Sequence, residues 1–192
     1  MTTSTKETNK VKEVYLPNVG KRNIKKNVAL DIALWACWLI LGFGIGFYFG
    51  SSKVNAAVMT EDDVHSMAED ISEDHFSGMI SPEFLTAIAY TESRYTPDVN
   101  QHGLMQINAR WQKDRMASLG VTDLQDPYQN MKLAAGYLVD LFSEYQDPGM
   151  VLMVYNMGPE DAEKFDSNNK LSSYAKKVLK LSAKLEEKYG KI

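Results

Sequence analysis

Glu92 occupies a position where an acidic side chain is unexpected. The sequence predicts a helix that begins at Ser81-Pro82, and Glu92 extends the apolar stripe of residues 84–89 by one helical step. A carboxyl group on the buried side of a helix has a raised pKa, because burial disfavours its charged form. A carboxylic acid that stays protonated near neutral pH is what the general acid of a glycosidase requires. The alternative interpretation is an acid near a helix end that turns into solvent or pairs with Arg94.

Three further segments follow Glu92-Ser93. They are, in order, Gly103-Leu104-Met105-Gln106, a helix that begins at Asp126-Pro127 and contains Asn130 and Gly136-Tyr137-Leu138, and Tyr155-Asn156-Met157-Gly158. From about Ser81 to Pro159 this pattern resembles the catalytic domain of lytic transglycosylases of the soluble-transglycosylase type, which has a lysozyme-like fold. A helical tail is expected behind the match.

The resemblance implies a role for each matched residue. Glu92 corresponds to the family's single catalytic acid. The predicted substrate-binding set is Gln106, Tyr155, Asn156, Met105 and Ser93. Within it, Met105 is expected to pack under the sugar cleft or touch a sugar face, and Ser93 to have a structural role at the helix end.

The sequence also departs from the family pattern. The loop between Glu92 and Gly103 is shorter than usual and lacks an expected sugar-binding hydroxyl. Ile107-Asn108 stands where many members have Met-Pro, which resembles members attached to conjugation and secretion machines or to virions. Substrate contacts are therefore less firmly implied than the role of Glu92.

The resemblance implies cleavage of the β-1,4 bond between N-acetylmuramic acid and N-acetylglucosamine in peptidoglycan, with formation of a 1,6-anhydro product. Glu92 would act first as general acid and then as base, with no metal ion and no cofactor. A hydrolase needs a second carboxylate, and Asp98 and Glu83 are expected to be solvated charges. The alternatives are a lysozyme-type hydrolase (muramidase) and a catalytically inactive, membrane-anchored module that binds peptidoglycan.

Helical periodicity dominates the chain after residue 53, and no strand-like alternation of useful length appears. An all-α domain is therefore expected over residues 60–192. The predicted helix starts are Thr60, Ser81-Pro82, Asp126-Pro127 and Asp147-Pro148, and a last helix carries Tyr174, Val178, Leu181, Leu185 and Tyr189 on one face. The three histidines, His65, His75 and His102, are expected at the surface.

Length and charge narrow the classes of function. With 192 residues the chain has room for one domain and a small appendage. Residues 54–192 carry 13 Lys and Arg against 22 Asp and Glu. An acidic domain of this kind argues against nucleic acid as a partner, because phosphate contacts need clustered cations.

A run of 19 residues without formal charge extends from Ile32 to Gly50. About 20 apolar residues in a helix span a bilayer, so residues 28–50 are predicted to be a single transmembrane helix. Four cations at 21–26 precede it, and the positive-inside rule then places residues 1–27 as a basic cytoplasmic tail. Residues 51–59 are read as a linker, and the catalytic domain lies outside the cell membrane or on a virion membrane.

Two other kinds of segment compete with a membrane anchor as interpretations of the apolar run. Cleavage as a signal peptide near Ala56 stays open, whereas a lipoprotein signal at Cys37 is rejected because the apolar run continues past that residue. The lipid bilayer and peptidoglycan strands are the expected partners. Gly42, Gly46 and Gly50 share a helix face through which two copies would pair, and docking on an envelope-spanning machine fits the resemblance.

Overall fold

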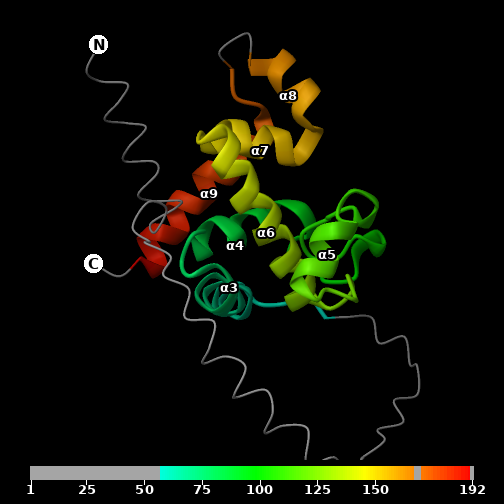
Figure 1. Ribbon diagram of the computed structural model, residues 1–192. Helices are drawn as coiled ribbons and strands as arrows, with labels where there is room; N and C mark the ends of the chain where they lie inside the picture. Colours follow the sequence, from blue (N-terminus) through cyan, green and yellow to red (C-terminus); the bar gives the residue numbers. More distant parts are fainter. Residues whose placement is uncertain (1–56, 167–169, 191–192) are drawn as a thin grey trace, which may run out of the picture. The chain divides into compact units, whose positions relative to one another are not determined.

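The computed structural model describes residues 57–166 and 170–190, which fold as helices joined by short loops (Figure 1). The helices are α3 (Glu61–Phe76), α4 (Pro82–Ser93), α5 (Lys113–Leu119), α6 (Pro127–Tyr145), α7 (Pro148–Met157), α8 (Pro159–Asp166) and α9 (Ser173–Tyr189), with 3-10 turns η1 (Val99–Gln101) and η2 (Ala109–Trp111). No strand occurs among the described residues, so the predicted all-α class is confirmed for them.

The predicted tail, the transmembrane segment and most of the linker lie outside the described residues. Cys37 and the glycines at 42, 46 and 50 fall there too, so these features stay predictions. Within the described ranges, none of the helices combines the length and apolar character that a bilayer crossing demands.

The four predicted helix starts are confirmed as N-caps. In each case a side-chain oxygen of the cap accepts a hydrogen bond from a backbone N–H of the first turn, which satisfies a donor that has no partner within the helix. The pairs are Thr60 with Asp63, Ser81 with Phe84, Asp126 with Gln129 and Asp147 with Met150. The caps fix where α3, α4, α6 and α7 begin.

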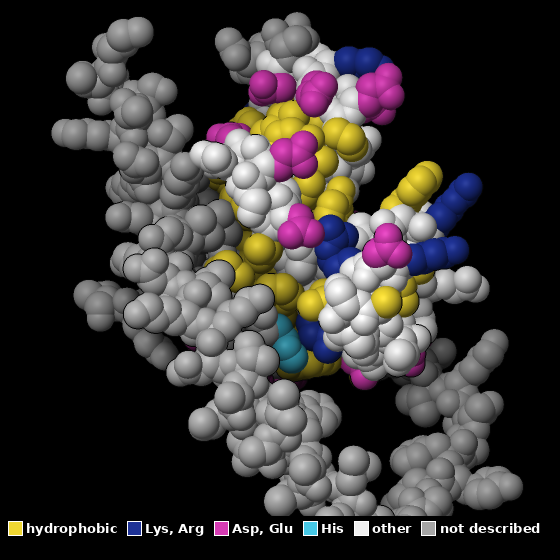
Figure 2. Space-filling view, viewed as in Figure 1, with side chains coloured by type: hydrophobic (Ala, Val, Ile, Leu, Met, Phe, Trp, Pro, Cys, Tyr) yellow, Lys and Arg dark blue, Asp and Glu magenta, His cyan; other side chains and the backbone are white. Residues whose placement is uncertain are grey.

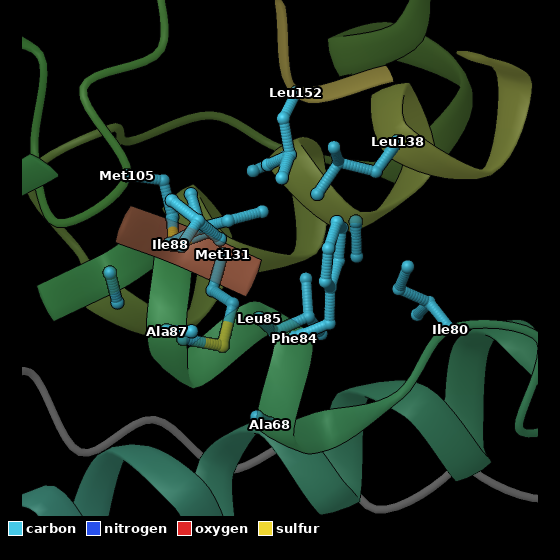
Figure 3. Close-up of a cluster of buried hydrophobic side chains, with 14 of the residues drawn as sticks. Ala68, Ile80, Phe84, Leu85, Ala87, Ile88, Met105, Met131, Leu138 and Leu152 are labelled. Carbon is cyan, nitrogen blue, oxygen red and sulfur yellow. The ribbon is translucent and has the colours of Figure 1, made fainter. Parts of the chain in front are cut away.

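Helix α4 lies at the centre of the domain and packs against α3, α6 and α9. Phe84, Leu85 and Ile88 of this helix are fully buried, in one cluster with Met131 of α6 and Leu152 of α7 (Figure 3). Burying a side chain of this size contributes about 1.5–3 kcal/mol relative to its exposed state. This packing fixes the axis of α4, and with it the position of Glu92 in the last turn.

The expected exposure of His65 and of Glu83 to solvent is wrong. His65 is only 4% exposed, and its ring stacks on that of Tyr189 with centroids 3.9 Å apart. Glu83 is not a solvated charge, because its Oε1 lies 3.3 Å from Nε2 of His65 and its Oε2 accepts a hydrogen bond from Ser81. Packing of α9 over α3 and α4 covers this group, and single-helix periodicity carries no signal of that packing.

Candidate functional site

Glu92 lies in the last turn of α4, half-buried against α9. The hydroxyl of Tyr174 in α9 donates a 2.6 Å hydrogen bond to Oε1 of Glu92. Arg94, the alternative partner, adopts a left-handed backbone conformation and places its guanidinium 4.4 Å from the centre of the Tyr90 ring. The carboxyl group therefore faces the interior of the domain, as the helical spacing predicts.

Burial raises the pKa of the Glu92 carboxyl above its ordinary value. The hydrogen bond from Tyr174 and the positive charge of Lys177 lower the pKa, but burial outweighs both. Burial and the negative charge of Glu92 also raise the pKa of Tyr155, so the hydroxyls of Tyr155 and Tyr174 both stay protonated in the field of this carboxylate. Glu92 thus combines a raised pKa with a fixed hydrogen-bond donor, which suits a general acid.

The loop that contains Gly103 and Met105 is held by a buried amide on α6. Asn130 is fully buried; its Oδ1 accepts from the backbone N–H of Met105 at 2.8 Å, and its Nδ2 donates to the carbonyls of His102 and Leu124. Gly103 has a φ of +71°, and a Cβ there would overlap with Asn130 and the Leu124 carbonyl. The close approach of loop and α6 therefore requires glycine.

The side chains of Gln106 and Tyr155 also form hydrogen bonds that hold this loop. Both N–H groups of the Gln106 side chain are used within the loop, in bonds to the carbonyls of Val99 at 2.9 Å and Gly103 at 2.8 Å. The Tyr155 hydroxyl donates to the Met105 carbonyl at 2.8 Å. The loop, α6 and α7 are thereby joined through polar groups.

An open cleft of about 560 Å³ lies between the loop and α7. Gln106, Tyr155 and Asn156, three of the predicted sugar-binding residues, line it. Its remaining lining residues are Ile107, Asn108, Trp111, Gln112, Tyr137, Val154, Met157, Gly158 and Pro159. Glu92 is not among the residues that line the cleft. Tyr155 links Glu92 to the cleft, because it lines the cleft and the negative charge of Glu92 raises its pKa.

The side chains of Met105 and Ser93 are buried and are not among the residues that line the cleft. The Met105 side chain is fully buried in the core. Ser93 is 6% exposed, and its hydroxyl donates to the Ala89 carbonyl one turn earlier in α4. These positions agree with the expected packing of Met105 and the expected structural role of Ser93, and their part in substrate binding stays a prediction.

The described residues contain no group of three or more His, Cys, Asp or Glu side chains placed to hold a metal ion. The chemistry available at the site is that of one carboxyl group, two tyrosine hydroxyls and a hollow with polar and aromatic walls. These groups can donate and accept one proton.

The family model described as Transglycosylase SLT domain matches residues 71–178. This chain belongs to the SLT transglycosylase family. A protein named "Transglycosylase" from Enterobacteria phage PRD1 is 33% identical over 105 residues, which cover 53% of this chain. The match spans 37% of the phage protein's length.

The SLT match includes two residues that the sequence reading did not place at the site. Tyr174 reads as part of the apolar face of the last helix, and only its contact with Glu92, 82 residues away, reveals its polar role. Trp111 is 74% exposed on the cleft wall. Its position directly after Asn108-Ala109-Arg110, next to the Gly-Leu-Met-Gln segment, is the signal that could have found it.

Proposed function

We propose that this SLT-family protein is a peptidoglycan lytic transglycosylase that cleaves the β-1,4 bond between N-acetylmuramic acid and N-acetylglucosamine. The observation that carries the proposal is the half-buried Glu92, with a raised pKa, bound to Tyr174 and close to a cleft lined by Tyr155. The name of the phage relative points in the same direction.

In this mechanism the acid proton of Glu92 is carried by Oε2, the carboxyl oxygen that does not accept the hydrogen bond from Tyr174. Because Oε1 accepts from Tyr174, Oε2 carries the acid proton towards the substrate. Glu92 transfers this proton to the glycosidic oxygen as its bond to the anomeric carbon of the muramic acid breaks. The 6-hydroxyl of the same sugar then bonds to that carbon and closes the 1,6-anhydro ring, while its proton returns to the Glu92 carboxylate.

The surroundings of Glu92 favour this intramolecular route over hydrolysis. Hydrolysis needs a second carboxylate at a defined distance from the first. Glu83 is nine residues away at the other end of α4, about 13 Å along the axis, and is bound to His65. Asp98 is exposed, in the loop after α4. Glu83 is thus too distant to activate a water molecule at Glu92, and a variant of Asp98 tests the other acid.

The full proposal keeps the predicted anchor. The segment at 28–50 would hold the catalytic domain on the outer side of the membrane, within reach of the wall. Pairing through Gly42, Gly46 and Gly50 and docking on an envelope-spanning machine stay predictions about the same segment.

The test is mass spectrometry of muropeptides released from purified peptidoglycan by the full-length chain, with detergent present. We expect products with an anhydro end, which are one water lighter than products with a reducing end. Glu92→Gln should abolish release. Asp98→Asn, which neutralises an exposed acid in the neighbouring loop, should leave the rate within about twofold, as surface changes usually do.

Two results would contradict the proposal. Reducing-end products that disappear with Asp98→Asn would identify a hydrolase with a second carboxylate. Binding to peptidoglycan without any release by the wild-type chain would identify a binding module.

A further inference from the structure

A second hollow, of about 430 Å³, adjoins the cleft at Trp111. It is lined by Arg110, Trp111, Lys113, Asp114 and Arg115, which come from η2 and the start of α5, and we call it the basic hollow. Trp111 lines both the cleft and the basic hollow. A chain-like ligand that leaves the cleft on this side therefore enters the basic hollow.

The positive charge of the basic hollow is concentrated in a domain that is otherwise acidic. Between Arg94 and Lys132 the chain has three cationic residues, and all of them lie at 110–115. Figure 2 shows Lys and Arg side chains gathered beside α5, next to a protruding hydrophobic side chain. Pro159, another lining residue of the cleft, is the first residue of α8, which carries four acids and one lysine. The basic hollow thus has three cationic residues against one acid, Asp114, whereas α8 has four acids against one lysine.

Two of the three cations are available to a ligand. Arg115 is engaged, since it bonds to Asp140 at 2.6 Å and also to Gln112. Arg110 and Lys113 are exposed and form no ion pair with any described residue. The Arg110 guanidinium lies 5.2 Å from the centre of the Trp111 ring, which keeps charge and ring face together.

We propose that the basic hollow binds the carboxylate-bearing stem peptides of a peptidoglycan strand whose sugars lie in the cleft; this rests on the proposed function. An arginine fork and a lysine ammonium pair with carboxylates, and the exposed indole face covers the apolar part of the peptide or the adjacent sugar. Two free cations suit the few carboxylates of a stem peptide. A nucleic acid or an anionic membrane surface needs a larger basic patch.

Binding of soluble glycan strands, prepared free of phosphate-bearing wall polymers, tests this inference. The full-length chain carries Glu92→Gln so that the ligand is not consumed, and the strands are compared with and without their stem peptides. We expect affinity about five- to tenfold higher for the strands with stems, from two solvent-exposed charge pairs. The double change Arg110→Gln and Lys113→Gln should remove this difference, whereas Lys180→Gln and Lys184→Gln, two exposed lysines on α9, should keep it.

The outcomes separate this inference from the proposed function. Equal affinity for the two kinds of strand, or a difference that survives in the Arg110 and Lys113 double variant, overturns the inference alone. Binding with a stem preference by a wild-type chain that releases no anhydro product overturns the proposed function alone. Binding of neither strand overturns both.

Discussion

Replacing Tyr174 by Phe tests the assignment of Glu92 most directly. The change removes one hydroxyl and keeps the ring that packs between α9 and α4. In the wild type this hydroxyl donates to Oε1 of Glu92 at 2.6 Å and lowers the pKa of the carboxyl, against the larger effect of burial. Without it the Glu92 pKa rises further. A general acid works only while protonated, so the rate should persist to higher pH.

The size of the effect follows from the difference between two hydrogen bonds. A hydrogen bond to a charged acceptor contributes about 1.5–3 kcal/mol net, and one to a neutral acceptor about 0.5–1.5 kcal/mol. The hydroxyl of Tyr174 therefore favours the carboxylate over the carboxylic acid by about 1 kcal/mol, roughly fivefold in the ionisation constant. Loss of the fixed orientation of the carboxyl group should also lower the plateau value of kcat by up to about tenfold.

The assay is the pH dependence of anhydro-product formation by the full-length chain. We expect the alkaline limb of kcat/KM, where activity falls as Glu92 ionises, to move to higher pH in Tyr174→Phe. Lys177→Gln is the control, because Lys177 acts on Glu92 through its charge and not through a hydrogen bond. It should move the limb in the same direction with an unchanged plateau. A limb that stays in place or moves to lower pH in Tyr174→Phe would refute the assignment of Glu92 as the titrating acid.

Three further changes probe the loop, the cleft wall and the acid itself. Gly103→Ala should lower the free energy of unfolding in urea by at least about 2 kcal/mol more than Gly120→Ala does. Both glycines have a positive φ, but only at Gly103 would an added Cβ meet neighbouring atoms. Similar losses of stability in the two variants would exclude the close packing of Gly103 on Asn130. Trp111→Ala should raise KM about tenfold and leave kcat within about twofold. Tm should stay nearly constant, because the indole ring is 74% exposed. A parallel fall in kcat would place Trp111 nearer the reacting bond. The raised pKa of Glu92 means that ionisation of this carboxyl opposes folding, so Glu92→Gln should raise Tm by about 2–4 °C at pH 7. At pH 3, below the ordinary carboxyl pKa of 4.5, the same change should leave Tm unchanged. A higher Tm at both pH values would mean that the charge of Glu92 is not the cause.

The sequence was sufficient where local rules decide the outcome. A cap and a proline fixed the starts of α4, α6 and α7, and the stripe on α4 predicted the side on which Glu92 lies. These features depend on neighbours within one or two turns, so one segment contains all the information needed.

The sequence was insufficient where packing between distant segments decides. No local pattern predicts helix α8, because a Gly-Pro pair such as Gly158-Pro159 is typical of a helix end, whereas Pro159 is also the first residue of α8. Helix α5 has seven residues, too few for a clear periodicity. The burial of His65 and the contact of Tyr174 with Glu92 arise from the docking of α9, which no local pattern encodes.

The polar side chains of Gln106 and Asn130 hold the loop in place. The side-chain N–H groups of Gln106 both donate to backbone carbonyls of the loop. Asn130 makes three hydrogen bonds that hold the loop to α6. Buried polar groups of this kind are costly when unpaired, so each fixes the backbone to which it bonds. The side chains that are exposed on the cleft wall, chiefly Trp111 and Asn156, are the ones that we expect to contact a ligand. We therefore expect substitutions at the exposed wall residues to change ligand binding without disturbing the loop that Gln106 and Asn130 hold in place.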